Sequence, residues 1–259
     1  MRIPVVKCSD ISVNIGKKSI LDKVNIEFHS HEFTVLLGPN GTGKSTLLKT
    51  LSNEMPYSGE HLIMGKPLCD WDKKVLAKQF GILPQSSSLT FNFTAQEVVE
   101  LGGLTLSGGQ KNITRVAKTK MEETGILHLA QRLYPSLSGG EKQRVHLARV
   151  LTQLDSIEHS KILFLDEPTS ALDLSHQHNT LQLTQQQAKQ GACVVAVLHD
   201  LNLAAQYADR IVVLNQGNIV ADGTPWEVLT SETIKEVYSW QTQVMPHPTQ
   251  QHPVILSAH

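Results

Sequence analysis

The chain has 259 residues, with 23 Lys plus Arg against 24 Asp plus Glu, and a formal net charge of −1. This balance excludes the bulk basic surface that nucleic-acid-binding proteins use, so no nucleic-acid partner is expected. Three cysteines, far apart in the sequence, are too few for a disulfide framework. The longest uninterrupted apolar run, residues 192–198, is too short to span a membrane. We expect a folded chain that does not itself cross a membrane.

Alternating apolar residues dominate the first part of the chain. Ile11, Val13 and Ile15 are spaced by two, a Gly-Lys-Lys turn follows, and the alternation resumes over residues 20–28. This pattern predicts antiparallel strands. We interpret the lysines of the turn, Lys17 and Lys18, as solvated charges.

Buried strands and helices alternate through the rest of the chain. Apolar runs predict buried strands at residues 34–37, 162–165 and 192–198, while helices are expected over 45–52, 177–190 and 201–208 and a hairpin over 211–221. Helix formers broken by glycine pairs predict a helical insert at about 86–160. These elements indicate an α/β fold with a parallel sheet and a single domain over residues 1–245. Residues 246–259, rich in Pro, Gln and His, are expected to form a mobile tail.

A glycine-rich phosphate loop lies between the strand at 34–37 and the following helix. It consists of Gly38, Pro39, Asn40, Gly41, Thr42, Gly43, Lys44 and Ser45, the pattern GxxxxGK[ST]. Its backbone N–H groups and the helix N-terminus favour phosphate binding. We expect Lys44 to reach the β- and γ-phosphates, Ser45 to ligate Mg²⁺ and Thr46 to contact the α-phosphate. A GTPase would also need an NKxD element, which the sequence lacks.

Two acids, Asp166 and Glu167, end the strand predicted at 162–165. Ligands of parallel sheets bind at the carboxyl ends of the strands. Asp166 is therefore a candidate Mg²⁺ ligand, and Glu167 is a candidate general base that polarises the attacking water. The alternative, in which these acids only cap the next turn, is less favoured because the phosphate loop is also present.

Further motifs follow in a fixed order: Gln85, the segment Leu137-Ser138-Gly139-Gly140-Glu141, the segment Ser170-Ala171-Leu172-Asp173, and His199-Asp200. With the phosphate loop and the acids, this set resembles the nucleotide-binding subunits of ABC transporters over about residues 3–240. The resemblance implies a P-loop NTPase (RecA-like) core, an antiparallel β subdomain, and a helical subdomain specific to that family at about 86–160. Residues 199–205 resemble the subunits that drive import of iron chelates, haem and cobalamin, and residues 134–151 and 170–178 favour haem.

The resemblance also implies how the site works. Two copies would form a head-to-tail homodimer that binds two ATP molecules at its interface. In it, Ser138, Gly139 and Gly140 of one copy would contact the γ-phosphate held by the partner's Lys44, with Asp173 beside them. His199 would contact the γ-phosphate and orient the water. Gln85 would ligate Mg²⁺ or water and link the site to the helical insert.

The implied partners and location follow from the same family. They are two membrane permease subunits, contacted by the helical insert, and a periplasmic or surface haem-binding protein that acts through the permease. The chain would lie peripherally at the cytoplasmic face of the inner membrane. Import of a ferric siderophore or cobalamin is an alternative, as is a soluble ATPase scaffold for iron–sulfur cluster assembly. A DNA-repair or translation ATPase is disfavoured by the single phosphate loop, and a regulator without hydrolysis by the presence of Glu167 and His199.

Two features depart from the family pattern. Residues 106–110 also spell the signature, Leu-Ser-Gly-Gly-Gln, but Ser107 lies much farther from Asp166 than Ser138 does, and Lys111–Thr114 starts a poor copy of the expected helix. We therefore assign the signature to Ser138. Many family members stack adenine on an aromatic residue just before the first glycine turn, where this chain has Ile15. Only a weaker apolar contact is expected there.

Overall fold

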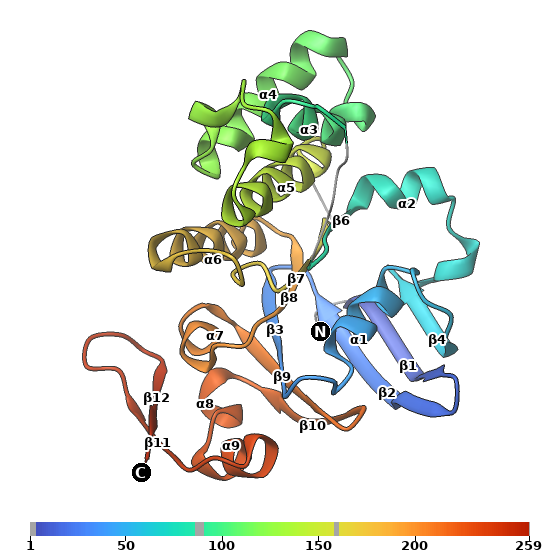
Figure 1. Cartoon of the computed structure of the whole chain (residues 1–259). Coiled ribbons are helices and arrows are strands. Elements are labelled where there is room, and N and C mark those ends of the chain that lie inside the picture. Colours follow the sequence, from blue (N-terminus) through green and yellow to red (C-terminus); the bar gives the residue numbers. More distant parts are fainter. Residues whose placement is uncertain (1–3, 86–90, 158–160, 259) are drawn as a thin grey trace.

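The apolar runs of the chain form a six-stranded sheet at the centre of the molecule (Figure 1). The computed structural model describes residues 4–85, 91–157 and 161–258. Five parallel strands lie in the order β9-β3-β8-β7-β6, and β10 pairs antiparallel with β9 at one edge. Their bounds are β3 Glu32–Leu37, β6 Phe80–Leu83, β7 Ile162–Asp166, β8 Cys193–Val197, β9 Arg210–Asn215 and β10 Asn218–Gly223. The predicted α/β fold with a parallel sheet is confirmed.

A smaller antiparallel sheet covers one side of the core. Its order is β2-β1-β4-β5, with bounds β1 Pro4–Ile15, β2 Lys18–His29, β4 Ser58–Ile63 and β5 Lys66–Pro67. The alternation read from the sequence is the cause, because Val6, Ile11 and Val13 of β1 turn inward and are buried. They share one apolar cluster with Phe164 of β7 and Val195 of β8, so the two sheets pack through a common core.

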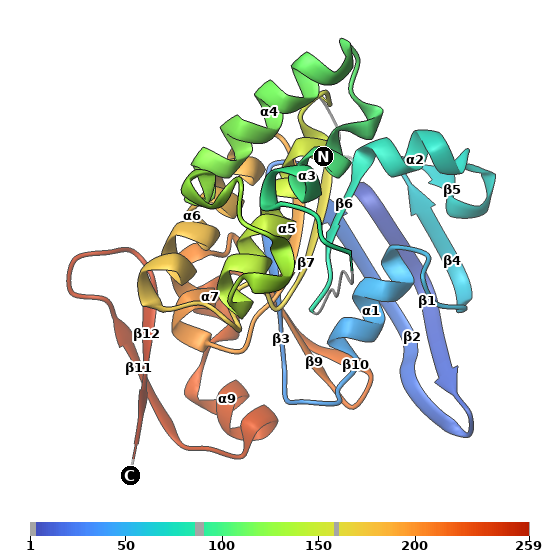
Figure 2. The same ribbon diagram turned by 45° about the horizontal axis from the view of Figure 1, so that its top comes forward.

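Helices flank both sheets. Their bounds are α1 Lys44–Leu51, α2 Lys73–Gln79, α3 Ala95–Glu100, α4 Gly109–Glu123, α5 Gly139–Leu154, α6 Leu174–Lys189, α7 Leu201–Tyr207, α8 Pro225–Val228 and α9 Ser231–Tyr238. The helices α3, α4 and α5 gather at one end of the molecule, away from the antiparallel sheet (Figures 1 and 2). They are the predicted helical insert, whose expected ends at residues 86 and 160 lie outside the described residues.

The helix α5 joins the helical group to the sheet. On one face Val145 and Ala148 pack in the core of the helical group. On the other face Leu147, Val150 and Leu151 pack in the core of the parallel sheet. Gly81 of β6 permits this contact, because a Cβ there would lie 2.6 Å from Cγ1 of Val150. The sequence alone does not predict β6 as a strand, because its apolar run is short and contains this glycine.

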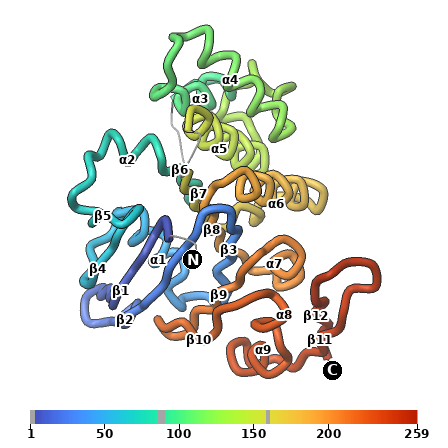
Figure 3. Tube along the Cα trace, turned by 180° about the vertical axis from the view of Figure 1, so that it is seen from behind, coloured from blue at the N-terminus to red at the C-terminus, as the bar shows by residue number. Residues whose placement is uncertain are grey.

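The C-terminal segment differs from its prediction. Residues 246–259 were expected to be a mobile tail, but most of them belong to a hairpin of β11 (Thr242–Pro246) and β12 (Pro253–Ser257). The hairpin lies beside α7 (Figures 1 and 3). Ile255 is only 9% exposed and packs in the core of the parallel sheet. The prediction of a mobile tail from composition was wrong, because contacts of Ile255 with distant residues hold this segment against the rest of the chain.

Within residues 4–85, 91–157 and 161–258, no helix combines the length and the apolar character needed to cross a membrane.

Candidate functional site

The phosphate loop connects β3 to α1 at the carboxyl end of the parallel sheet. Its first glycine is required by crowding, since a Cβ on Gly38 would lie 2.1 Å from the carbonyl oxygen of Leu214. Gly43 caps α1 with a φ of 106° and offers no side chain to the helix N-terminus. The N–H groups of the first turn of α1 are therefore available to an anion.

Lys44 is buried at the start of α1, and its ammonium group donates to the loop itself. Nζ lies 2.7 Å from the carbonyl oxygen of Gly38 and 2.8 Å from that of Pro39. Burial lowers the pKa of Lys44, and the charges of Glu167 and Asp166 oppose that shift. The loop thus carries a desolvated cation at the position where phosphates are expected.

Asp166 ends β7 and is directed at α1. Its Oδ1 accepts a hydrogen bond from Oγ of Ser45 at 3.0 Å. Burial raises the pKa of Asp166, and the Ser45 hydrogen bond opposes this shift. A carboxylate and a hydroxyl oxygen side by side are the hard ligands that Mg²⁺ prefers. These two predicted Mg²⁺ ligands come together in the fold.

Glu167 is held in an unusual backbone conformation by its neighbours. Its φ of 52° lies in the left-handed region, which costs a residue with a side chain about 1–3 kcal/mol. Its carbonyl oxygen accepts from Nε2 of Gln143 on α5 at 2.8 Å and from the N–H of Ser170 at 3.3 Å. These bonds stabilise a backbone turn that aims the carboxylate at the site.

His199 meets the carboxylate of Glu167. Its Nε2 lies 2.7 Å from Oε1 of Glu167, and the two side chains are 45% and 16% exposed, respectively. An imidazole nitrogen and a carboxylate oxygen held this close can together orient a water molecule. The predicted base and the predicted orienting residue are therefore paired in the structure.

One cavity of about 490 Å³ collects most of the predicted site residues. It is lined by Asn40, Gly41, Gly43, Lys44, Ser45, Thr46, Gln85, Glu167 and His199, together with Lys18 and Ile20. The last two residues were missed: Lys18 was interpreted as a solvated charge, and no role was assigned to Ile20. Ile15, where an apolar adenine contact was expected, is 54% exposed and is not among the lining residues. The apolar contact of Ile15 with adenine stays a prediction.

The signature residues lie apart from this cavity within one chain. Ser138 caps α5 and forms a reciprocal capping box with Glu141. Asp173 caps α6, accepting from the N–H of His176 at 3.0 Å. Gly139 lines a neighbouring cavity of about 210 Å³ together with Gln85 and Gln143. Among the described residues, none of Ser138, Gly139, Gly140 and Asp173 lines the cavity around Lys44. Their contact with ATP across a dimer stays a prediction.

The second signature-like segment has a different local structure. Gly108 caps α4 with a φ of 93° and no side-chain hydrogen bond. Ser107 provides only its carbonyl oxygen, which accepts from Nδ2 of Asn112 at 2.8 Å. Ser138, by contrast, accepts the N–H of Glu141 at its own helix start. The copy at residues 106–110 therefore lacks the serine cap seen at Ser138.

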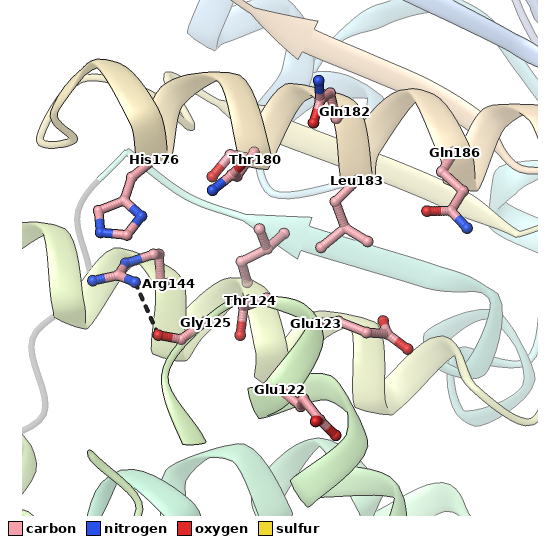
Figure 4. Close-up of a pocket in the computed structure, with 12 residues that line it drawn as sticks. Glu122, Glu123, Thr124, Gly125, Arg144, His176, Thr180, Gln182, Leu183 and Gln186 are labelled. Atoms are coloured by element: carbon pink, nitrogen blue, oxygen red, sulfur yellow. Dashed lines mark hydrogen bonds between the residues drawn. The ribbon is translucent and has the colours of Figure 1, made fainter. Parts of the chain in front are cut away.

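A further cavity of about 420 Å³ lies between the end of α4 and the side of α6 (Figure 4). Arg144 of α5 points toward its edge and donates from Nη1 to the carbonyl oxygen of Gly125 at 3.2 Å. Two acids, Glu122 and Glu123, and the amide of Gln186 line its opposite part. No residue of the predicted site lines this cavity. It lies where the helical group meets α6, outside the cavity around Lys44.

Comparison with known proteins gives both sequence relatives and fold neighbours. The ABC transporter family profile matches residues 21–170, a range that includes the phosphate loop and the carboxylate pair. A hemin import ATP-binding protein of Vibrio cholerae serotype O1 is 55% identical over 259 residues, 100% of each chain. That of Photobacterium damsela subsp. piscicida is 54% identical over 252 residues, 97% of this chain and 95% of the relative.

Solved structures share the fold at lower identity. A metal-chelate type ABC transporter in an inward-facing conformation aligns with a TM-score of 0.80 at 24% identity, over 99% of this chain and 98% of the other. The cbiO1 protein of Clostridium perfringens, part of the ABC transporter complex cbiONQ, aligns with a TM-score of 0.74 at 27% identity, over 90% and 93%. The fold therefore extends over nearly the whole chain.

Proposed function

The chain belongs to the ABC transporter family, as an ATP-binding subunit, and we propose that it hydrolyses ATP to power the import of haem through a separate permease. The observation that carries the hydrolysis is the contact of His199 with Glu167 beside the phosphate loop. The haem substrate is supported by relatives named hemin import ATP-binding proteins at 54–55% identity over nearly the whole chain. Nothing in this role requires the chain itself to touch haem.

ATP binding would begin at the phosphate loop. The ammonium group of Lys44, which now bonds two loop carbonyls, would turn to the β- and γ-phosphates, and Thr46 would meet the α-phosphate. Ser45 and Asp166 would hold Mg²⁺, with Gln85 as a third oxygen donor at the same cavity. Bound there, Mg²⁺ would offset the negative charge of the β- and γ-phosphates.

Hydrolysis would use Glu167 and His199 on one water molecule. The Glu167 carboxylate accepts a proton from the water while the water oxygen attacks the γ-phosphorus. The bond between the γ-phosphorus and the oxygen that bridges it to the β-phosphate breaks, which releases ADP and inorganic phosphate. His199 orients the water and contacts the γ-phosphate. A positioned base of this kind typically contributes about 10²–10⁴-fold to the rate.

A second copy of the chain would complete the site. The first turn of α5 contains backbone N–H groups that have no partner within the helix, yet Ser138, Gly139 and Gly140 do not line the cavity around Lys44 of their own chain. In a head-to-tail homodimer, Ser138, Gly139 and Gly140 would meet the γ-phosphate bound to the other copy, with Asp173 beside them. Closure of the dimer on two ATP molecules and its reopening after hydrolysis would then drive the permease.

The remaining partners follow from the importer role. Two membrane permease subunits would contact the helical group α3–α5, and the chain would lie peripherally at the cytoplasmic face of the inner membrane. A periplasmic or surface haem-binding protein would deliver haem to the permease. Ferric siderophore or cobalamin import is the alternative for the substrate, and a scaffold in iron–sulfur cluster assembly is the alternative from another class. Cofractionation of the chain with membranes is expected and would exclude the scaffold.

Growth on haem as sole iron source tests the substrate. Deletion of the gene for this chain is expected to abolish growth on haem. The wild-type gene should restore growth, whereas the Glu167→Gln variant should not, because transport requires hydrolysis. Growth on inorganic iron in each strain is the control for viability. Unchanged growth of the deletion strain on haem would contradict the haem assignment, and siderophores and cobalamin would then be tested in the same strains.

The bond from Gln143 to Glu167 tests how the base is positioned. Gln143→Ala removes the donor to the Glu167 carbonyl. We expect kcat for ATP hydrolysis to fall by about 2–10-fold, which corresponds to the net free energy of one hydrogen bond. KM for ATP is expected to stay constant, since the phosphate loop is intact. The matched control is Gln186→Ala, an exposed glutamine on α6 that lines the other cavity. A wild-type kcat in Gln143→Ala would show that the other contacts of Glu167 suffice.

A further inference from the structure

The C-terminal hairpin is hydrogen-bonded to α7, the helix that begins two residues after His199. Nδ2 of Asn202 donates to the carbonyl oxygen of Ile255 at 3.1 Å, and the N–H of Ile255 donates to Oδ1 of Asn202 at 2.8 Å. Asn202 lies in the first turn of α7, three positions after His199. One side-chain amide thus pairs with both polar backbone groups of one β-strand residue.

This pairing uses an edge of the hairpin that its own ladder leaves open. Ile255 is opposite Val244 of β11, but its N–H and carbonyl groups both bond Asn202. In an antiparallel pair, residues alternate between hydrogen-bonded positions and positions whose N–H and C=O groups point away from the partner strand. The bonds to Asn202 put Ile255 in a position of the second kind. Asn202 therefore pairs with the open edge of β12 as a residue of a neighbouring strand would. In addition, the Ile255 side chain packs into the same core as Leu203 of α7.

The helix α7 depends on such contacts for its position. It has only seven residues, too few for a stable helix without tertiary packing. Near its C-terminal end, the Tyr207 hydroxyl lies 2.7 Å from Nδ1 of His178 on α6. Near its start, Asp200 caps the helix and Asn202 ties it to the hairpin. His199 is joined to this first turn and reaches Glu167.

We propose that Asn202 is a positioning residue for ATP hydrolysis, which clamps the C-terminal hairpin to α7 and thereby holds His199 against Glu167. The hairpin then serves the site although it contributes no residue to the cavity around Lys44. The hairpin is also held elsewhere, because Nε1 of Trp226 donates to the carbonyl oxygen of Gln251 at 3.3 Å. Loss of the Asn202 clamp should therefore release α7 without freeing the whole hairpin. This inference rests on the proposed ATPase function.

Full-length variants at position 202 test the clamp through ATP hydrolysis. Asn202→Ala removes both hydrogen bonds, and we expect kcat to fall by about 5–20-fold with KM for ATP within about twofold. Asn202→Asp keeps the acceptor for the Ile255 N–H but not the donor, so its loss should be intermediate. Leu256→Ala is the matched control, since Leu256 follows Ile255 and is 43% exposed. Thermal unfolding checks that each variant is folded, and if Asn202→Ala is not, Asn202→Asp carries the test.

A double-mutant cycle with His199 separates positioning from a merely structural role. In single-turnover measurements, Asn202→Ala should add no further loss in a His199→Ala background, because both changes remove the same interaction. A wild-type kcat in folded Asn202→Ala, an equal fractional loss in both backgrounds, or a rise in KM that accounts for the effect would each overturn the proposal. Wild-type protein without ATPase activity would instead overturn the proposed function itself.

Discussion

Glu167→Gln is expected to lower the rate of ATP hydrolysis by about 10²–10⁴-fold while leaving ATP binding intact. The amide has nearly the shape of the carboxylate and keeps a partner for Nε2 of His199, which lies 2.7 Å from Oε1 in the wild type. It cannot accept a proton from water, so only the chemical step is lost. The measurement is steady-state phosphate release, combined with equilibrium binding of ATP to the same preparation.

The control for this variant is Glu122→Gln, an exposed acid that lines the cavity between α4 and α6. It changes the net charge equally and lies outside the cavity around Lys44. We expect wild-type hydrolysis from it. If Glu167→Gln hydrolysed ATP within threefold of the wild type, the base would be another group, and the left-handed turn at Glu167 would need a different explanation.

The second large effect is expected at the start of α5, where Ser138→Arg should reduce ATP hydrolysis by at least about 100-fold, as loss of transition-state donors does. Ser138 accepts the N–H of Glu141 and caps the helix. An arginine removes this cap and places a long side chain before Gly139 and Gly140, where the γ-phosphate of the other copy is expected. Hydrolysis is measured at saturating ATP, and ATP binding to the phosphate loop of the same chain should survive.

The second signature-like segment supplies the matched control. Ser107→Arg makes the same substitution before the same Gly-Gly pair, but at a helix start that has no side-chain cap. We expect its ATPase rate to equal that of the wild type. Loss of hydrolysis in Ser107→Arg with retention in Ser138→Arg would reverse the assignment of the signature.

The parts of the site that the sequence predicted are those made by neighbouring residues. The phosphate loop needs a strand, a glycine turn and a helix in succession, and all three follow from contiguous patterns between residues 32 and 51. Asp166 is the last residue of β7 and follows four apolar residues, with Glu167 directly after it, so the place of both acids at the sheet edge follows from the apolar run itself. His199 was grouped with them only through the family resemblance, and the parallel pairing of β7 and β8 is what brings it to the same edge of the sheet.

The tertiary structure alone decided the contacts that support these residues. Gln143 reaches the Glu167 carbonyl across 24 positions, and Asn202 reaches Ile255 across 53. Each side chain bonds backbone groups, which nearly every residue type offers, so no sequence pattern at the partner position marks the pair. The hairpin at 242–257 was hidden for the same reason, because its order comes from burial of Ile255 against the sheet core and not from its own composition. Sequence thus determined the chemical groups of this protein and their local turns, while long-range packing decided what holds them in place.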